Sequence, residues 1–239
     1  GGTDAQHLRF ARWRDGRWSA PTSIVVDGGI GNVADMPHVR QTADGALWAT
    51  WLRRIGQGHA RGLVLARSVD DGRSWSAPQR VNLDGTATEH GFASLWPEGR
   101  DAIGIAWLDG RETGEHAMHG MQAGATMLRT AVFDARLWRR DEKAIDTVTC
   151  DCCQTAVAMA ASGPVLFYRD RTDDEVRDIV AARLTDGTWG EPQAVHADGW
   201  KSEGCPVNGP PAAADGNNVV VAWYTEANDK PTVLAARSA

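Results

Sequence analysis

One eight-residue segment, from Ser68 to Trp75, constrains the fold of this 239-residue chain more than any other feature. It reads Ser-Val-Asp-Asp-Gly-Arg-Ser-Trp, which has the chemistry of a tight turn between two strands. The Asp70 carboxylate can accept backbone N–H groups across the turn, and Gly72 allows a positive φ where a side chain would clash. Trp75 can fold back and bury its ring beneath the turn. The octet therefore predicts two strands that meet at a fixed register.

Diverged copies of this turn recur along the chain. The segment 131–138 keeps the length and the tryptophan, and segments 14–18 and 185–189 are shorter copies. This register makes four tryptophans equivalent: Trp18, Trp75, Trp138 and Trp189. An apolar strand that ends in an aromatic residue also repeats, at 47–51, 103–107, 165–168 and 219–223. A period of roughly 50–60 residues with about four short strands per unit is typical of the blades of a β-propeller.

The repeats predict one all-β domain, a β-propeller of four-stranded antiparallel blades. We expect blades at about 36–82, 89–145 and 150–195, with partial blades at 7–26 and 204–239. One blade alone cannot bury its two faces, so neighbouring blades must pack around a common axis. The chain starts within a blade and ends where another octet should begin. We therefore expect residues 1–239 to be a fragment that holds about four blades of a longer propeller.

The octet resembles the Asp-box of sialidases and related propellers built from BNR repeats. The resemblance extends over nearly the whole chain through the repeats, although one box alone is intact. It implies a sialidase-like propeller with six blades when complete, and a substrate site on the face opposite the Asp-box. It also implies a secreted or periplasmic protein whose signal peptide has been removed, because Asp-box proteins are commonly secreted.

Composition bears on the partners of the protein. The net charge of −6 and the pI of about 5.6 argue against nucleic acid. No apolar run approaches the roughly 18 residues of a membrane span. We therefore expect the partner to be a small molecule, a glycan or a metal ion.

Soft and borderline metal ligands fall on one predicted face. Connections alternate between two faces in an antiparallel blade, so the starts of the first strands lie opposite the octet. Thiolate, thioether and imidazole groups that converge there suit Cu(I) or Zn(II). The predicted ligands come from these strand starts and from a loop at 116–121: Cys150, Cys152, Cys153, Cys205, His38, His90, His116, His119, Met118 and Met121.

Two further uses of the cysteines stay open. Cys152 or Cys153 could form a disulfide with Cys205 across neighbouring blades, which would suit an oxidising compartment. A redox-active dithiol is the other alternative, and either arrangement leaves two cysteines for a second role.

The sialidase resemblance implies an arginine triad, an aspartic acid that donates a proton, and a tyrosine nucleophile paired with a glutamate. The family's Arg-Ile-Pro segment does not occur here, and Tyr168 shares the register of packed aromatic residues. The acidic and basic residues that close the second strands could bind an acidic sugar or form salt bridges. The catalytic candidates are Asp109 with Arg111, Asp170 with Arg171, and Tyr224 with Glu226.

The sequence thus supports three functional hypotheses. The first is a propeller with a metal-binding or redox thiol site on the face opposite the octet. The second is a glycoside hydrolase of the exo-α-sialidase type, and the third is a non-catalytic propeller that binds a glycan or a protein. Whether the protein is an enzyme stays open at this point.

Overall fold

The structure is a computed structural model, and we describe its residues 6–27, 30, 34–56, 60–114 and 124–238. The regular elements in these ranges are strands and one short 3₁₀ helix, η2 (Ala227–Asp229). No helix among them is long and apolar enough to span a membrane. The strands are β1 (Gln6–Phe10), β2 (Trp13–Arg14), β3 (Arg17–Trp18), β4 (Thr22–Asp27), β5 (His38–Gln41), β6 (Leu47–Arg54), β7 (Arg61–Ser68), β8 (Gln79–Arg80), β9 (His90–Glu98), β10 (Ala102–Asp109), β11 (Met127–Phe133), β12 (Arg139–Asp146), β13 (Ala156–Ala160), β14 (Gly163–Arg169), β15 (Ile179–Thr185), β16 (Thr188–Trp189), β17 (Gln193–Ala194), β18 (Ala212–Asp215), β19 (Asn218–Thr225) and β20 (Thr232–Ser238).

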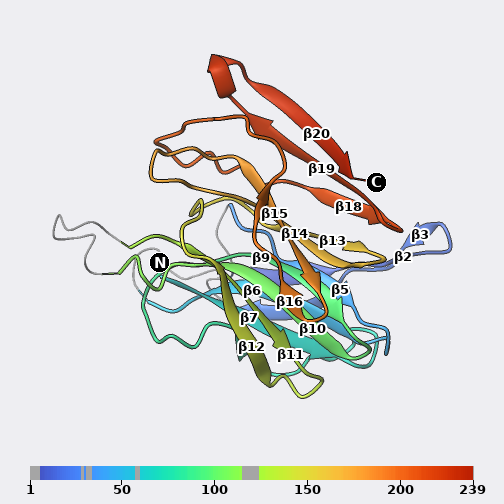
Figure 1. The fold of residues 1–239 in the computed structure, drawn as a ribbon. Coiled ribbons are helices and arrows are strands. Elements are labelled where there is room, and N and C mark those ends of the chain that lie inside the picture. Colours follow the sequence, from blue (N-terminus) through green and yellow to red (C-terminus); the bar gives the residue numbers. More distant parts are fainter. Residues whose placement is uncertain (1–5, 28–29, 31–33, 57–59, 115–123, 239) are drawn as a thin grey trace.

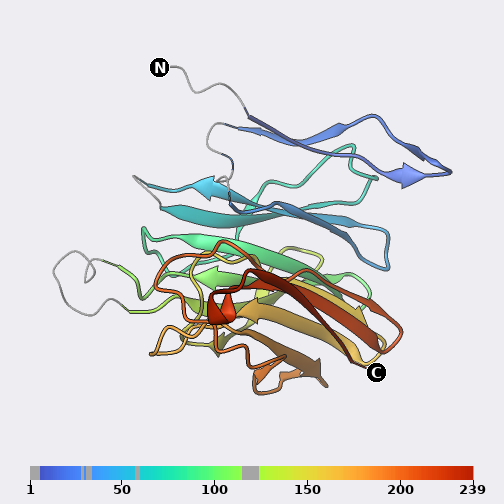
Figure 2. The same cartoon turned by 90° about the horizontal axis from the view of Figure 1, so that it is seen from above.

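These strands form antiparallel sheets in chain order (Figure 1). The pairs β1–β4 and β2–β3 are followed by the sheet β5-β6-β7-β8 and the sheet β9-β10-β11-β12. Next come β13-β14-β15-β16, with β17 also on β15, and then β18-β19-β20. Figure 2 shows the blue N-terminal strands beside the sheet of β5–β8, which lies beside the sheet of β9–β12. The first strands contact one another in succession, β5 with β9, β9 with β13 and β13 with β18. This arrangement of inner strands is that of propeller blades.

The core lies between sheets, and strand β10 shows why. All its residues are buried, and successive side chains point to opposite faces of a strand. Ile103, Ile105 and Trp107 pack toward the sheet of β5–β8, whereas Ala106 and Leu108 pack toward the sheet of β13–β17. The near-continuous apolar run is therefore the mark of a strand with a neighbouring blade on each side.

The aromatic residues of the repeated strand serve this packing. Trp51, Trp107, Tyr168 and Trp223 each belong to a buried cluster between sheets. The Tyr168 hydroxyl also donates a hydrogen bond to Asp146, with an O···O distance of 2.6 Å. The interpretation of Tyr168 as a packing residue is confirmed.

The octet forms the turn between β7 and β8. Asp70 Oδ1 accepts the Ser74 N–H at 2.9 Å, and the Ser68 hydroxyl accepts the Gly72 N–H at 2.9 Å. Gly72 has a φ of +83°. The half-buried Trp75 packs edge-to-face on Phe10 of the preceding sheet, with 5.9 Å between ring centroids. The predicted turn chemistry is confirmed.

The expected equivalence of Trp138 with Trp75 is wrong by one position. Asp134 Oδ1 accepts the Trp138 N–H at 3.0 Å, as Asp70 accepts the Ser74 N–H. Trp138 therefore occupies the place of Ser74. A shift of one residue turns a strand side chain to the opposite face, and the Trp138 ring is 69% exposed.

Candidate functional site

A strained backbone position marks the start of β9. Phe92 is buried and has a φ of +52°, which is unusual for a bulky residue. The pairing of β9 with β10 shifts register beside it, as in a β-bulge. Two contacts hold this conformation: the Phe92 N–H donates to Asp35 Oδ2 at 2.6 Å, and the Phe92 carbonyl accepts the Thr155 hydroxyl at 2.8 Å. Strain of this kind concentrates at functional sites.

Asp35 is a half-buried residue whose carboxyl group has an unusual acidity. Burial raises its pKa from 3.8 to about 7, against the lowering effect of the Phe92 N–H, and the nearby negative charge of Glu89 raises it further. Asp35 precedes β5, and its carboxylate lies against Gly91, where a methyl group on Cα would overlap it. A carboxyl group with a pKa near 7 can donate or accept a proton at neutral pH.

A pocket of about 250 Å³ opens beside this carboxyl group. Its lining combines acidic, hydroxyl and apolar groups with two cysteines. Because Gly91 and Phe92 both line the pocket and both contact Asp35, the carboxyl group sits directly behind the pocket wall. The lining residues are Glu89, Gly91, Phe92, Leu108, Gly110, Thr113, Thr126, Asp151, Cys152 and Cys205.

The four cysteines lie close together at the edge of this pocket. Cys152 and Cys205 form a disulfide across 53 positions of sequence, which confirms the expected bridge between neighbouring blades. Cys150 and Cys153 are buried free thiols whose Sγ atoms lie 2.8 Å apart. The Cys150 Sγ also lies 3.9 Å from the Cys152 Sγ.

This arrangement limits which cysteines could bind the predicted copper or zinc ion. The disulfide occupies Cys152 and Cys205, so Cys150 and Cys153 are the thiols that remain. Two thiolates on one tetrahedral zinc, with Zn–S near 2.3 Å, lie about 3.8 Å apart. The observed 2.8 Å between the two sulfurs is shorter than this separation. A metal at this site stays a prediction that requires these two sulfurs to separate.

Buried arginines surround the free thiols. Arg169 is 1% exposed, donates to the carbonyls of Asn208, Arg177 and Tyr224, and stacks on Trp200. Burial lowers its pKa, and the negative charge of the Cys153 and Cys150 thiolates opposes this effect. Together with the buried Arg177, which lies beside Cys150, Arg169 gives the cysteines a positive environment.

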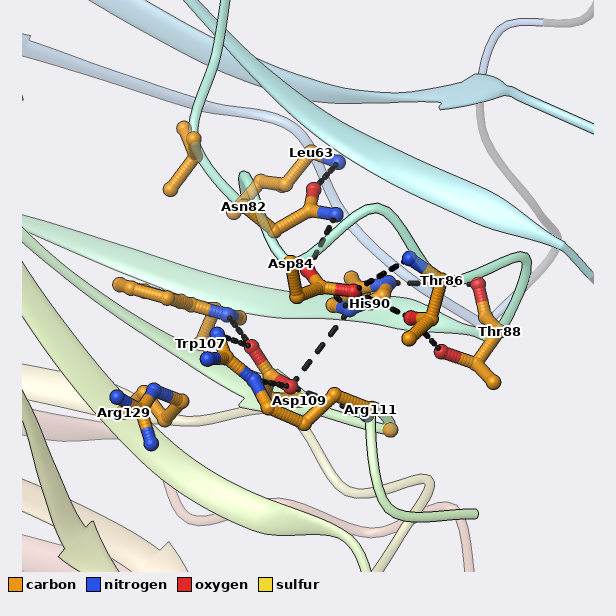
Figure 3. A network of polar contacts seen from close by, with 12 residues as sticks. Leu63, Asn82, Asp84, Thr86, Thr88, His90, Trp107, Asp109, Arg111 and Arg129 are labelled. Carbon is orange, nitrogen blue, oxygen red and sulfur yellow. Dashed lines mark hydrogen bonds and ion pairs between the residues drawn. The ribbon is translucent and has the colours of Figure 1, made fainter. Parts of the chain in front are cut away.

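His90 belongs to a different cluster, shown in Figure 3. Its Nδ1 lies 3.2 Å from the Arg61 carbonyl and 3.3 Å from the Thr88 carbonyl. Its Nε2 lies 3.1 Å from Asp84 Oδ1 and 3.6 Å from Asp109 Oδ1. The structure therefore surrounds the buried ring with oxygen acceptors and does not bring it to the cysteines.

Asp109 and Arg111 form the centre of that cluster. Asp109 Oδ1 accepts the Arg111 Nε–H at 2.8 Å, and its Oδ2 accepts Arg111 Nη2 and Trp107 Nε1, both at 2.8 Å. Arg111 also reaches Glu142, which pairs with Arg129. Burial alone would raise the pKa of Asp109, but the Arg111 hydrogen bonds and its other partners hold it below the usual value. Asp109 and Arg111 thus form a salt bridge at the blade junction in which both Asp109 oxygens accept hydrogen bonds.

The remaining catalytic candidates also have structural partners. The Asp170 carboxylate accepts the Arg171 backbone N–H at 2.7 Å, whereas the Arg171 guanidinium pairs with Glu175 at 2.6 Å. The expected Asp170–Arg171 side-chain pair is therefore replaced by Arg171–Glu175. The Tyr224 hydroxyl donates to Glu226, and this hydrogen bond raises the Tyr224 pKa. A raised pKa makes Tyr224 a poorer nucleophile.

The other predicted metal ligands are placed as follows. His38 Nε2 lies 3.3 Å from Gln154 Nε2, and burial, with a contribution from Arg40, lowers the pKa of His38 to about 4. Gln154 follows the cysteines directly and also donates to the Ala93 carbonyl at 2.7 Å. His38 is thus a neighbour of the cysteine segment. His116, Met118, His119 and Met121 lie outside the described residues.

Sequence reasoning missed Asp35, Glu89 and the arginines around the thiols. A signal for the first two was present, because each is an acidic residue a few positions before a first strand, in successive blades. The arginines gave no local signal, since Arg169 and Arg177 reach the cysteines only through the fold.

The architecture is similar to that of several solved structures. The chain matches an α-L-arabinanase of Penicillium chrysogenum in complex with arabinobiose, with a TM-score of 0.59 and 12% identity over 98% of this chain and 74% of that one. It matches an α-L-arabinofuranosidase of Fusarium graminearum, also with arabinobiose, with a TM-score of 0.53 and 11% identity over 87% of this chain and 64% of that one. The fold is a β-propeller.

A third solved structure, an ulvan lyase with a bound saccharide, has a TM-score of 0.53 and 11% identity over 100% of this chain and 64% of that one. The chain thus spans less than two thirds of the length of the last two proteins. No protein-family model matches the chain, and no curated protein matches it at the significance threshold applied. The predicted all-β propeller is confirmed, and the sialidase family stays a prediction.

Proposed function

We propose that the protein is a glycan-active propeller that cleaves a glycosidic bond in the pocket at the start of β9, with Asp35 as the proton donor. The observation that carries this proposal is the half-buried Asp35 carboxyl group, whose pKa is raised to about 7 and which contacts two residues of the pocket wall. Propellers of similar fold that bind arabinobiose or an ulvan saccharide support it.

Asp35 and Glu89 are two carboxyl groups close enough to interact, which suits this chemistry. Most glycoside hydrolases pair a protonated acid with an ionised carboxylate, and environments that push two pKa values apart assign these roles. Asp35 holds its proton near neutral pH because it is buried and because the charge of Glu89 opposes its ionisation. Glu89, which lines the pocket, is then the carboxylate that stabilises positive charge on the sugar ring.

The pocket itself suits a small polar ligand. Its volume of about 250 Å³ is below the roughly 300–1,000 Å³ of sites for drug-sized ligands. The hydroxyl groups of Thr113 and Thr126 and the carboxylate of Asp151 can pair with sugar hydroxyls, while Phe92 and Leu108 supply apolar contact. One sugar ring, with the rest of the glycan outside, is the ligand that these features favour.

The test is release of sugar from a panel of glycans that includes arabinan, arabinobiose, ulvan and sialosides. We expect wild type to cleave at least one of them, with kcat/KM falling as the pH rises through about 7, because the acid must carry its proton. Asp35→Asn should abolish turnover, whereas Asp101→Asn, in an exposed turn, should not change it. Equal turnover by wild type and Asp35→Asn would refute the role of Asp35.

The same panel decides between this proposal and the other hypotheses. An exo-α-sialidase would need Tyr224 as nucleophile, but the hydrogen bond that its hydroxyl donates to Glu226 raises the Tyr224 pKa and makes it a poorer nucleophile. We therefore expect Tyr224→Phe to keep its activity, and a loss confined to sialosides would favour a sialidase instead. Saturable binding of a glycan by wild type with no turnover would favour a recognition propeller.

We also propose that the protein works in the periplasm or outside the cell. The Cys152–Cys205 disulfide supports this location, because such bridges persist in oxidising compartments. Protein recovered from the native host should retain the bridge when its thiols are alkylated before lysis. A reduced bridge in that sample would contradict the proposed location.

A further inference from the structure

Beside the pocket, the four cysteines form a group that the proposed glycan chemistry does not use. Two are buried thiols and two form a disulfide that lines the pocket, with Cys205 exposed. Cys150 and Cys153 are separated by two residues, which is the spacing of many redox-active dithiols. One chain therefore places a dithiol next to a disulfide.

Cys150 has the environment of a nucleophilic thiolate. The Cys153 thiol, 2.8 Å away, and the Cys152 backbone N–H donate to its sulfur, and Arg177 adds positive charge. Cys150 is therefore the sulfur whose surroundings favour a thiolate.

The structure also shows why this charge is tolerated in the interior. The Arg177 side chain is 3% exposed and pairs with Glu175 at 2.8 Å and with Asp151 at 3.8 Å. Interaction with the Cys150 thiolate raises its pKa. Arg169, beside Cys153, donates to three backbone carbonyls. Two buried guanidinium groups thus face the thiols, and a thiolate there has counter-charges at hand.

We propose that these cysteines form a thiol–disulfide relay, in which the surface bridge Cys152–Cys205 carries electrons from the buried dithiol to an external small-molecule disulfide. The distance of 3.9 Å between Cys150 Sγ and Cys152 Sγ places the nucleophile beside the bond that it attacks. The relay is independent of the glycan site, although the two share the pocket wall.

The internal steps balance without an outside reactant. The Cys150 thiolate attacks Cys152 Sγ, so that a Cys150–Cys152 bond forms, the Cys152–Cys205 bond breaks and Cys205 leaves as a thiolate. Cys153, after losing its proton to that thiolate, attacks Cys150, which forms Cys150–Cys153 and releases the Cys152 thiolate. The dithiol and the disulfide have then exchanged places.

The external steps complete the cycle. The exposed Cys205 gives up the proton that it took from Cys153, attacks the small-molecule disulfide as a thiolate, forms a mixed disulfide and releases one small thiolate, which takes up the proton. The Cys152 thiolate then attacks Cys205, restores the surface bridge and releases the second small thiolate. In sum the Cys150 thiolate and the Cys153 thiol lose two electrons and one proton, and one external disulfide becomes one thiol and one thiolate.

The experiment uses oxidised glutathione as the external disulfide. Wild-type protein is incubated with it, quenched with an alkylating reagent at intervals, and mapped by mass spectrometry of its cysteine peptides. We expect loss of both free thiols, appearance of a Cys150–Cys153 bridge, release of two glutathione thiols per chain and a transient adduct on Cys205. The matched control is Cys152→Ser with Cys205→Ser, which keeps the buried dithiol but removes the relay.

In that control the buried dithiol should oxidise about tenfold or more slowly, since no exposed sulfur passes its electrons outward to the external disulfide. Circular dichroism of the control checks that it folds, and Cys150→Ala is the second variant, which should block oxidation without loss of the surface bridge. Equal oxidation rates in wild type and the folded control would overturn the proposal. A copper or zinc ion found bound to the thiols of purified wild type, which protects them from alkylation, would overturn it too.

Discussion

Asp109, buried at the end of β10, and Asp35, half-buried ahead of β5, are carboxyl groups near the same pocket, yet their surroundings differ in kind. Asp109 accepts two hydrogen bonds from the Arg111 guanidinium and one from Trp107, and its pKa is held below the ordinary value. Asp35 accepts the Phe92 backbone N–H, has the charge of Glu89 nearby, and its pKa is raised to about 7. One carboxylate is compensated by a cation, and the other is held in a place that disfavours its charge.

The two carboxyl groups show how counter-charges distinguish a structural carboxylate from one that can transfer a proton. A buried carboxylate whose oxygens all face donors and cations fixes the geometry of a junction, but it has no proton to give. A carboxyl group in a place that disfavours its charge costs stability at neutral pH, and such groups gather at functional sites. The Cys150 thiolate lies between the two cases, because it has guanidinium neighbours and also a disulfide to attack.

The largest expected effect on stability is at Asp109, the carboxylate that pairs with a cation. Asp109→Asn keeps the shape but leaves Arg111 and His90 without their shared carboxylate, so we expect a loss of about 3 kcal/mol in the free energy of unfolding. Urea denaturation at pH 7 measures it, with Asp101→Asn as the neutral control. A loss below about 1 kcal/mol would show that the cluster is not the frame of this junction.

Gly91→Ala tests how closely the pocket wall fits Asp35. Its methyl group would overlap the Asp35 carboxylate and press on Leu52, so we expect a loss of about 1–3 kcal/mol together with lower turnover. The control is Gly114→Ala, since a methyl group there meets no atom within 4 Å. If Gly91→Ala matches this control in both stability and turnover, Asp35 does not sit behind the pocket as described.

Local chemistry allowed much of the frame to be predicted from sequence. The octet specifies its own hydrogen bonds, and the aromatic strands follow from burial on two faces. Trp138 shows the limit, because the shift by one position depends on which residue caps the turn, and Asp134 takes that role. A register that is set by one hydrogen bond cannot be read from residue types alone.

The site was less accessible to such reasoning. His90 and Cys205 share the position at strand starts that suggested a common metal, yet Asp84 and Asp109 engage the ring of His90, and Cys152 engages Cys205. The face on which side chains fall follows from the repeat, but their pairing depends on distances of a few ångströms. The position of Asp35 before a first strand is visible in the sequence, but its raised pKa is not, since it results from burial by the neighbouring blade.

A smaller effect is expected at the octet turn, on the face opposite the site. Ser68→Ala removes the acceptor of the Gly72 N–H and a partner of Asp70, which should cost about 1 kcal/mol. The melting temperature should fall by about 2–4 °C for a domain of this size, with Ser162→Ala in an exposed turn as control. Turnover should not change. A loss of activity would contradict the claim that the octet turn stabilises the fold without taking part in the site.

The most direct test of the central claim is the stability of wild type and Asp35→Asn as a function of pH. The ordinary pKa of 3.8 is raised to about 7 in the folded state, so the stability that Asp35 contributes is present below pH 4 and lost as the pH rises toward 7. Since each pKa unit corresponds to about 1.4 kcal/mol, the variant should gain up to ~4 kcal/mol over wild type between pH 4 and pH 7 and level off above. Urea denaturation at several pH values measures this difference. A difference that stays flat from pH 4 to pH 8 would mean that Asp35 is as well compensated as Asp109, and the account would be wrong.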